Sequence, residues 1–172
     1  METRIERADG VALRVHASGV AELVRDAVEN GASIGFVLPF ENGELAAYAE
    51  SLAADSDEGS RVVLLAFDGE ALTGMVQLEL PWKPNARHRA EVQKLLVHTT
   101  ARRRGLGRQL MDEVERAALA DGRTLLVLDT ATDAADALYR SLGYTEIGVI
   151  PRYAGLPSGE LVATTIFAKE LS

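Results

Sequence analysis

Cysteine is absent from the 172-residue sequence, and this absence removes several kinds of chemistry at once. Without cysteine there is no disulfide framework, no thiolate nucleophile, and no zinc or iron–sulfur site built on sulfur. Folding does not need such supports, because a chain of this length buries about two-thirds of the surface that its unfolded form exposes. The length, with 47% hydrophobic and 26% charged residues, predicts one domain over residues 1–172.

Long apolar runs are also missing. The longest run falls well short of the ~18–20 residues that are needed to cross a bilayer. The charged N-terminal segment METRIERADG lacks the apolar core of a signal peptide. We therefore expect a cytoplasmic protein that does not enter a membrane.

Basic residues are outnumbered, with 18 Lys and Arg against 26 Asp and Glu, and the net charge is −8. This balance argues against general nucleic-acid binding. Between Arg87 and Arg108, however, seven basic residues accompany a single acidic one. This local excess of positive charge indicates a defined anion site on an acidic protein, and a solvated basic face is the alternative.

Hydrophobic periodicity in the first third of the chain predicts a strand followed by two helices. The strand is predicted over Val11–Ala17. Ser18 would cap the first helix, Asn30-Gly31 would end it, and a second helix would run through residues 45–53. The apolar loop between them, residues 31–40 (GASIGFVLPF), is either a lid on the core or the wall of a substrate site.

The rest of the chain predicts alternating strands and helices. Residues 61–80 form a hairpin around Asp68-Gly69, and a long strand follows at 89–98. Subsequent segments are a helix after Arg104, a buried strand at 124–129, a helix capped by Thr132, and strands near 144–149 and 161–169. The order β-α-α-β-β-β-α-β-α-β-β predicts a mixed α/β sheet.

The most informative stretch is the strand EVQKLLVH, the loop RRRGLG (Arg102–Gly107) and the amphipathic helix that follows. A helix N-terminus presents N–H groups without intrahelical partners and about half a positive charge, so it attracts anions. Gly105 and Gly107 would let the backbone approach a phosphate without interference from a Cβ atom. We therefore expect a phosphate or pyrophosphate ligand here.

Two common phosphate-binding motifs do not fit this stretch. No G-x-x-x-x-G-K-[ST] string occurs in the chain. The dinucleotide fingerprint G-x-G-x-x-G, starting at Gly105, would need glycine at position 110, where the chain has Leu110. A nucleoside triphosphate and a nicotinamide cofactor are therefore disfavoured.

The loop instead resembles the pyrophosphate loop of the GNAT superfamily of N-acetyltransferases. Arg102–Gly107 fits the pattern [RQ]-x-x-G-x-[GA] after a strand, and Leu138–Tyr144 (LYRSLGY) resembles a second segment of that family. Within the superfamily, the segments RAEVQKLLV and GLGRQLMDEVE are similar to the tabtoxin-resistance acetyltransferases, which acetylate a β-lactam-containing amino-acid toxin. The resemblance implies a single α/β domain with a mixed, mostly antiparallel sheet of about seven strands and about four flanking helices.

The resemblance also implies acetyl-CoA as the cofactor. Its pantetheine arm would pair with the strand at residues 95–97, and its pyrophosphate would lie on the backbone amides of residues 103–108. Thr132 stands where the family often has asparagine, but its hydroxyl can still cap the helix. The implied cofactor-binding residues are Leu95, Leu96, Val97, Arg102, Arg103, Arg104, Gly105, Leu106, Gly107, Arg108, Thr132 and Ala135.

Two carboxylates are candidates for binding or deprotonating the acceptor amine. An alkylamine with a pKa near ~10.4 is almost wholly protonated at neutral pH, so acetylation needs a base. Glu91 lies on a predicted strand, and Asp129 ends another strand at the edge where open α/β sheets bind ligands. Both align with acids of the similar toxin-resistance enzymes. Alternatively, Glu91 pairs with Arg87 or Arg89 at the surface, and Asp129 caps the following turn.

Tyr139 is the third catalytic candidate, because it aligns with a tyrosine that many relatives place beside the thioester sulfur. Moving a proton from a phenol (pKa ~10) to a thiolate (pKa ~8.5) is uphill by about 2 kcal/mol, so hydrogen bonding to sulfur is favoured over full proton transfer. A core tyrosine on the helical stripe is the alternative. His16, His88 and His98 lack metal-ligand spacing, and we expect no metal site.

These features predict an acetyl-CoA-dependent N-acetyltransferase that acts on a small-molecule amine, either an amino-acid-like compound or a toxin or antibiotic. We expect direct transfer in a ternary complex, because no cysteine is present to carry the acetyl group. A protein or peptide acetyltransferase and a coenzyme A-binding module without turnover are the alternatives. A homodimer is one of the oligomeric states that the sequence leaves open.

Overall fold

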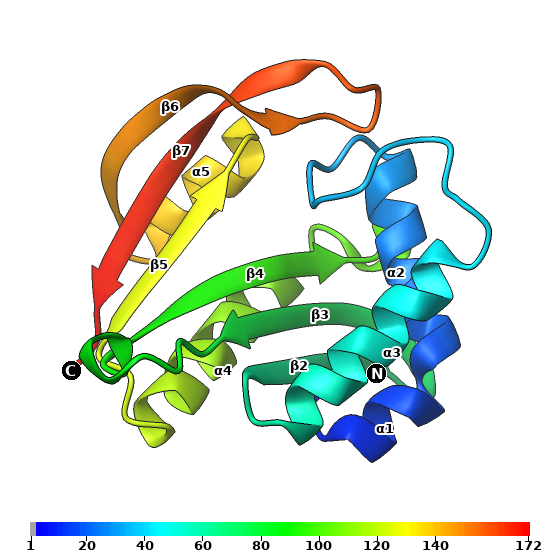
Figure 1. Cartoon of the computed structure of the whole chain (residues 1–172), viewed down its shortest axis with the longest axis horizontal. Coiled ribbons are helices and arrows are strands. Elements are labelled where there is room, and N and C mark those ends of the chain that lie inside the picture. Colours follow the sequence, from blue (N-terminus) through cyan, green and yellow to red (C-terminus); the bar gives the residue numbers. More distant parts are fainter. Residues whose placement is uncertain (1–2) are drawn as a thin grey trace.

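Seven strands and five α-helices make up residues 3–172, the part of the chain that the computed structural model describes (Figure 1). In chain order they are β1 (Thr3–Ala8), α1 (Gly10–Val15), α2 (Ala17–Glu29), α3 (Glu44–Asp57), β2 (Arg61–Asp68), β3 (Ala71–Glu79), β4 (Arg89–Val97), α4 (Leu106–Ala120), β5 (Leu125–Thr130), α5 (Asp133–Ser141), β6 (Thr145–Gly155) and β7 (Leu161–Glu170). Short 3-10 turns at Pro84–Ala86 and Thr99–Ala101 flank β4. The predicted succession of elements is confirmed from α2 onward.

All seven strands join one sheet in the order β1-β2-β3-β4-β5-β7-β6. Every neighbouring pair of described strands is antiparallel except β4 and β5, which are parallel. The sheet is therefore mixed, as the order of elements predicts, and mostly antiparallel, as the family resemblance implies. The parallel pairing extends only from Arg89↔Leu125 to Glu91↔Val127, and beyond it the two strands separate, as Figure 1 shows.

Helices cover both faces of the sheet and bury two cores. Side chains alternate along β2: Val62, Leu64 and Ala66 face the core that includes α4, whereas their neighbours face the core under α2 and α3. This alternation explains why residues 61–67 read as a continuous apolar run, since a strand covered on both faces has no solvent side.

The predicted strand over Val11–Ala17 is wrong. These residues form α1 and the start of α2, because Asp9 caps α1 by accepting a hydrogen bond from the backbone N–H of Ala12 at 2.8 Å. Leu13 is buried, whereas Val11 and Val15 are 69% and 72% exposed, so the alternating valines do not mark an inward face.

The first strand is instead Thr3–Ala8, which forms an edge of the sheet and carries several charged residues. The predicted Ser18 cap is also wrong, since α2 begins at Ala17 directly after α1. No helix in residues 3–172 combines the length and apolar character needed to cross a membrane.

Candidate active site

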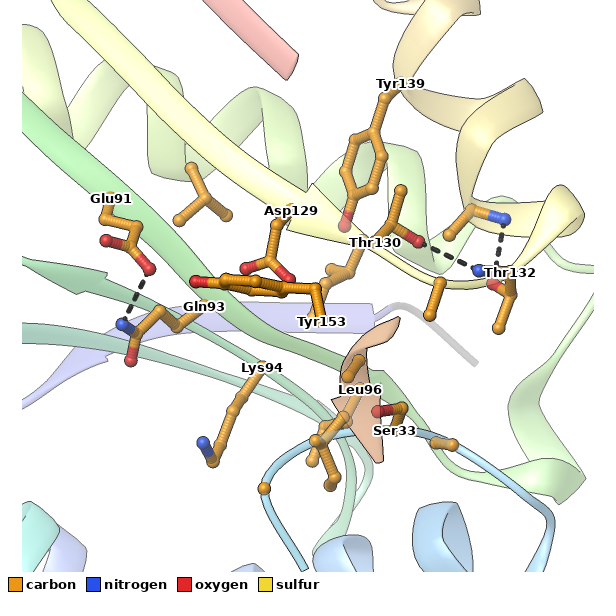
Figure 2. A pocket seen from close by; sticks show the side chains of 18 of the residues that line it. Ser33, Glu91, Gln93, Lys94, Leu96, Asp129, Thr130, Thr132, Tyr139 and Tyr153 are labelled. Carbon is orange, nitrogen blue, oxygen red and sulfur yellow. Dashed lines mark hydrogen bonds between the residues drawn. The ribbon is translucent and has the colours of Figure 1, made fainter. Parts of the chain in front are cut away.

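A cavity of about 470 Å³ opens where β4 and β5 separate (Figure 2). Its walls come from the loop at residues 32–35, from β4 at 91–96, from the end of β5 and the start of α5 at 129–139, and from residues 153–155 of β6. Glu91, Asp129 and Tyr139, the three predicted catalytic residues, all line it. Segments far apart in the sequence therefore meet at the point where the parallel pairing ends.

A bulge in β4 changes the course of this strand beside the cavity. The register with β3 passes from Gln77↔Gln93 to Met75↔Leu96, so two residues of β4 lie opposite a single residue of β3. Lys94, in the bulge, has a φ of 47°, which is unusual for a residue other than glycine. The bulge bends β4, and its site next to the end of the β4–β5 pairing contributes to the opening between the strands.

Glu91 is held by a polar network rather than by an arginine. Its carboxylate accepts a hydrogen bond from Gln93 Nε2 at 3.0 Å, and Arg61 donates to Gln93 Oε1 at 2.8 Å. Within residues 3–172, Glu91 forms no ion pair with Arg87 or Arg89, so that alternative is not observed. The network fixes the position of a carboxylate on the wall of the cavity.

Asp129, the last residue but one of β5, faces the cavity (Figure 2). Burial raises the pKa of its carboxyl above the ordinary value, and the charge of Lys94 acts in the opposite direction. Asp129 does not cap the next turn: Thr130 Oγ1 accepts from the N–H of Thr132 at 3.3 Å, and Thr132 Oγ1 accepts from the N–H of Ala135 at 3.4 Å. The two threonines perform the local capping.

Tyr139 belongs both to the core and to the cavity. The residue is 6% exposed, and its ring packs 5.8 Å from the ring of Tyr144 and 6.0 Å from that of Phe167, measured between centroids. Its hydroxyl points into the cavity beside Asp129 (Figure 2). Burial, followed by the charges of Asp129 and Asp136, raises the pKa of Tyr139 to about 12. The core position and the cavity position are therefore compatible.

The loop before α4 contains two residues with positive φ. Gly105, the N-cap of α4, has a φ of 80°, a conformation that favours glycine, and Arg103 has a φ of 63°. Gly107 lies in the first helical turn, where an added Cβ would meet Leu138 Cδ2 at 3.5 Å. Leu106 is buried, so only its backbone is available to a ligand.

The arginines of this loop are exposed and only loosely paired. Arg102 lies 3.8 Å from Asp26, Arg104 lies 3.6 Å from Asp68, and Arg108 donates a hydrogen bond to Ser141 Oγ at 2.7 Å. Such exposed pairs contribute little to stability and can rearrange around a ligand.

The predicted cofactor-binding residues fall into two groups. Leu95, Leu96, Thr132 and Ala135 line the cavity together with the catalytic candidates. Val97 and residues 102–108 are not among its lining residues and follow it along the chain, at the end of β4 and the start of α4.

Several cavity residues escape sequence reasoning. Lys94 belongs to the basic stretch between Arg87 and Arg108, and its position in the cavity depends on the β4 bulge. Tyr153 comes from β6, and nothing in its local sequence distinguishes it. The apolar loop at 31–40, for which the sequence leaves a lid and a site wall as alternatives, contributes residues 32–35 to the wall of the cavity.

Several solved structures with the same architecture are acetyltransferases. An N-acetyltransferase from Staphylococcus aureus Mu50 is 15% identical with a TM-score of 0.82, and the match covers 100% of both chains. A GNAT superfamily phosphinothricin acetyltransferase from Sinorhizobium meliloti, in complex with AcCoA, is 20% identical with a TM-score of 0.78 over 100% of this chain and 90% of that one. A ribosomal-protein-alanine N-acetyltransferase from Brucella melitensis is 26% identical with a TM-score of 0.78 over 98% and 99% of the two chains.

The sequence itself matches a family model over residues 20–144, which is more than half of the chain. The matched segment runs from α2 through α5 and contains the glycine loop, Glu91, Asp129 and Tyr139. The chain belongs to the acetyltransferase (GNAT) family, whose acetyl donor is acetyl-CoA.

Proposed function

We propose that this protein transfers the acetyl group of acetyl-CoA directly to the amine of a small, amino-acid-like molecule. The observation that carries the proposal is the cavity between β4 and β5, whose walls bring together two carboxylates and a buried phenol. Acetyl-CoA supplies the acetyl group as an activated thioester. The protein's own residues bind the two substrates, take up the amine proton and stabilise charge at sulfur.

The residues present fit a molecule with a diphosphate and an extended arm. The N-terminus of the 15-residue helix α4 offers backbone N–H groups, and Gly105 allows the chain to turn tightly in front of them. The parallel pairing of β4 with β5 ends at Glu91, so the backbone of Leu95–Val97 is not paired with β5 and is open to an extended ligand. These features support binding at residues 95–97 and 103–108.

In this proposal Asp129 and Glu91 have different roles toward the amine. Asp129 acts as the base, because burial raises the pKa of its carboxyl and a base is most effective when its pKa approaches the working pH. Glu91 is fixed by Gln93 and Arg61, which suits a group that orients the incoming ammonium.

Tyr139 donates a hydrogen bond to the thioester sulfur as negative charge develops there. With a pKa of about 12, proton transfer from this phenol to a thiolate (pKa ~8.5) would be uphill by about 5 kcal/mol. Hydrogen bonding without transfer is therefore the role that its environment favours.

Neither a cysteine nor Ser33 is available to carry the acetyl group as a nucleophile. The chain has no cysteine, and the hydroxyl of Ser33 donates to the carbonyl oxygen of Gly155 at 2.8 Å. Direct attack of the amine in a ternary complex is consistent with these facts.

A small acceptor is favoured because the cavity is closed along one side. The loop at 32–35 is joined to β6 by the Ser33–Gly155 hydrogen bond, and the N–H of Leu38 donates to the carbonyl of Pro157 at 2.8 Å. The resemblance to tabtoxin-resistance acetyltransferases and the name of the Sinorhizobium protein both support an amino-acid-like acceptor. The name of the Brucella protein supports the alternative, a peptide N-terminus.

The experiment that tests the proposal measures release of coenzyme A thiol from acetyl-CoA. The absence of cysteine means that a thiol reagent will not react with the protein itself. We expect turnover with phosphinothricin or other amino-acid-like amines and little with peptides that begin with alanine. Turnover confined to the peptides would favour the alternative, and acetyl-CoA binding without turnover on any amine would leave a binding module.

A further inference from the structure

Lys94 is a cavity residue that the proposed mechanism does not use. Its side chain leaves the bulge of β4, and its ammonium lies 5.5 Å from the ring centroid of Tyr48 on α3. A Cβ built on Gly35 would be 4.0 Å from Lys94 Nζ, so the ammonium also lies next to the loop at 32–35. Figure 2 shows Lys94 on the wall opposite Tyr139.

The ammonium of Lys94 has no carboxylate partner. None of the ion pairs formed within residues 3–172 involves it. Lys169 provides the comparison, because its side chain is 23% exposed and its Nζ lies 2.7 Å from the Glu115 carboxylate. A half-buried lysine elsewhere in this protein is therefore paired, whereas the one in the cavity is not.

The environment of Lys94 disfavours its charged form, so an anion bound nearby would stabilise the ammonium. Burial, followed by the positive charge of Arg61, lowers the pKa of Lys94. The carboxylates of Asp129, Glu79 and Glu91 act in the opposite direction without reaching ion-pair distance. An anion that entered the cavity would compensate for the hydration that the ammonium has lost.

The charges around the cavity are therefore separated. Two carboxylates, Glu91 and Asp129, lie on β4 and at the end of β5, and the single ammonium of Lys94 lies next to the loop at 32–35. A ligand with an ammonium and a nearby anionic group would complement both the carboxylates and the Lys94 ammonium. A polyamine or an aminoglycoside would instead place further positive charge near Lys94.

We propose that Lys94 binds the anionic group of the acceptor, so that the acceptor is a molecule whose amine and carboxylate, or a similar oxyanion, are only a few bonds apart. The proposal rests on the proposed function and names its substrate class. The amine lies toward Asp129 and Glu91, and the carboxylate lies toward Lys94. Lys94 is thereby a specificity-determining residue.

The test compares amino acids with the same molecules lacking the carboxylate. L-leucine is paired with isopentylamine and L-methionine with 3-methylthiopropylamine, and phosphinothricin is added as a third oxyanion-bearing acceptor. Each is assayed for acetylation by the wild-type protein, Lys94→Met, Lys94→Arg and the control Lys83→Met. Lys83 is exposed and outside the cavity, so its substitution removes the same charge without touching the site.

We expect the wild-type protein to prefer the amino acids, and Lys94→Met to raise their KM about 10- to 100-fold, the factor for one lost charge-assisted hydrogen bond. Lys94→Arg should restore part of the preference, and the KM values of the decarboxylated amines should not rise in any variant. Methionine preserves the length of the side chain and the strain of a non-glycine residue at φ 47°, so stability is little affected by the backbone.

Three results would overturn the inference: equal activity on both members of each pair, an unchanged preference in Lys94→Met, or a weaker affinity for acetyl-CoA in that variant. Calorimetric titration of the coenzyme A-loaded protein separates this failure from failure of the proposed function. If amino acids bind through Lys94 but no amine is acetylated, the inference holds and the function fails. If amines are acetylated without regard to a carboxylate, the function holds and the inference fails.

Discussion

At the scale of single residues, the two acids of the cavity have different environments, so their substitution should affect different kinetic constants. Asp129→Asn should lower kcat by about 10²–10⁴-fold, the usual contribution of a general base, with acetyl-CoA affinity preserved. Glu91→Gln should act mainly on the KM of the amine, because Gln93 holds that carboxylate in place. Steady-state kinetics with both substrates varied provides the measurement, and unchanged turnover in both variants would remove them from the mechanism.

The raised pKa of Tyr139 predicts how the effect of its substitution on kcat depends on pH. Because the pKa of its phenol is raised to about 12, the hydroxyl stays protonated and able to donate between pH 6 and 10. Tyr139→Phe should therefore lower kcat about 10- to 100-fold by the same factor across this range. A pH profile of both proteins checks it. A loss in the wild-type protein that appears above pH 9 and is absent from the variant would mean that the phenol ionises in the working range.

Substitution of Gly107 tests the cofactor loop, because folding stability and acetyl-CoA affinity should respond differently to it. Gly107→Ala places a methyl group at ordinary contact distance from Leu138 and removes a glycine from the first turn of α4. The fold should be unaffected or stabilised by about 0.5–1 kcal/mol. Acetyl-CoA affinity should fall about tenfold, equal to about 1.4 kcal/mol, if the pyrophosphate lies on this backbone. Calorimetry and urea unfolding measure the two, and unchanged affinity would place the pyrophosphate elsewhere.

The catalytic candidates can be predicted from the sequence, but the other residues that line the cavity around them cannot. Glu91, Asp129 and Tyr139 can be predicted because two of them lie on recognisable strands and the third lies in a family segment. Lys94 and Tyr153 cannot, because the first depends on a bulge and the second on a strand that crosses to the cavity from the far edge of the sheet. Local patterns do not encode such tertiary juxtapositions.

At the scale of elements, β2, β3, β4 and α3 are tied together by Arg61. Its guanidinium is 3.1 Å from Asp55 and donates to Gln77 at 3.2 Å and to Gln93 at 2.8 Å, and its side chain is only 16% exposed. Arg61→Met should therefore destabilise the protein by about 2 kcal/mol, the scale of lost hydrogen bonds to a charged group.

Urea unfolding measures this cost, and Arg116→Met is the matched control. Arg116 is 67% exposed and pairs with Glu113 within α4, so its loss should cost well under about 1 kcal/mol. Equal effects of the two substitutions would show that the buried network adds no stability.

The elements that were predicted correctly have strong periodicity or distinct end signals. In α2, Val20, Leu23, Val24, Ala27 and Val28 are all buried as the pattern requires. The first strand was missed for the opposite reason, because an edge strand such as TRIERA carries charge on much of its length and has little apolar alternation. The short helix α1 is not evident from the sequence because Leu13 is its single buried residue with an apolar side chain, Gly10 being the other buried residue, and one such position gives no period.

At the scale of the whole molecule, the cavity should reduce the stability of the fold. The pKa of Asp129 lies above its unfolded value and that of Lys94 below, so each ionised group disfavours the folded state at neutral pH. Asp129→Asn and Lys94→Met should each raise the thermal midpoint at pH 7, whereas Lys83→Met should not. Methionine retains contact with Tyr48 in place of the ammonium.

The sign of each effect can be checked by changing the pH. The gain from Asp129→Asn should disappear as the pH falls below ~3.9, where the unfolded carboxyl is protonated as well. The gain from Lys94→Met should disappear only above pH ~10.4, where the unfolded lysine is neutral. Thermal unfolding at several pH values measures both, and a lower midpoint in either variant at pH 7 would contradict the argument.

The hydrogen bond from Ser33 to Gly155 joins two short surface segments that belong to opposite ends of the chain. Neither segment overlaps the glycine loop at 102–108, where the diphosphate is proposed to bind. Exchanges at 32–35 and 153–155 would therefore redirect which amine is selected while leaving the donor loop unaltered. In an evolving gene, this separation lets a new acceptor arise from a few substitutions in one loop and at the end of β6, without rebuilding the scaffold.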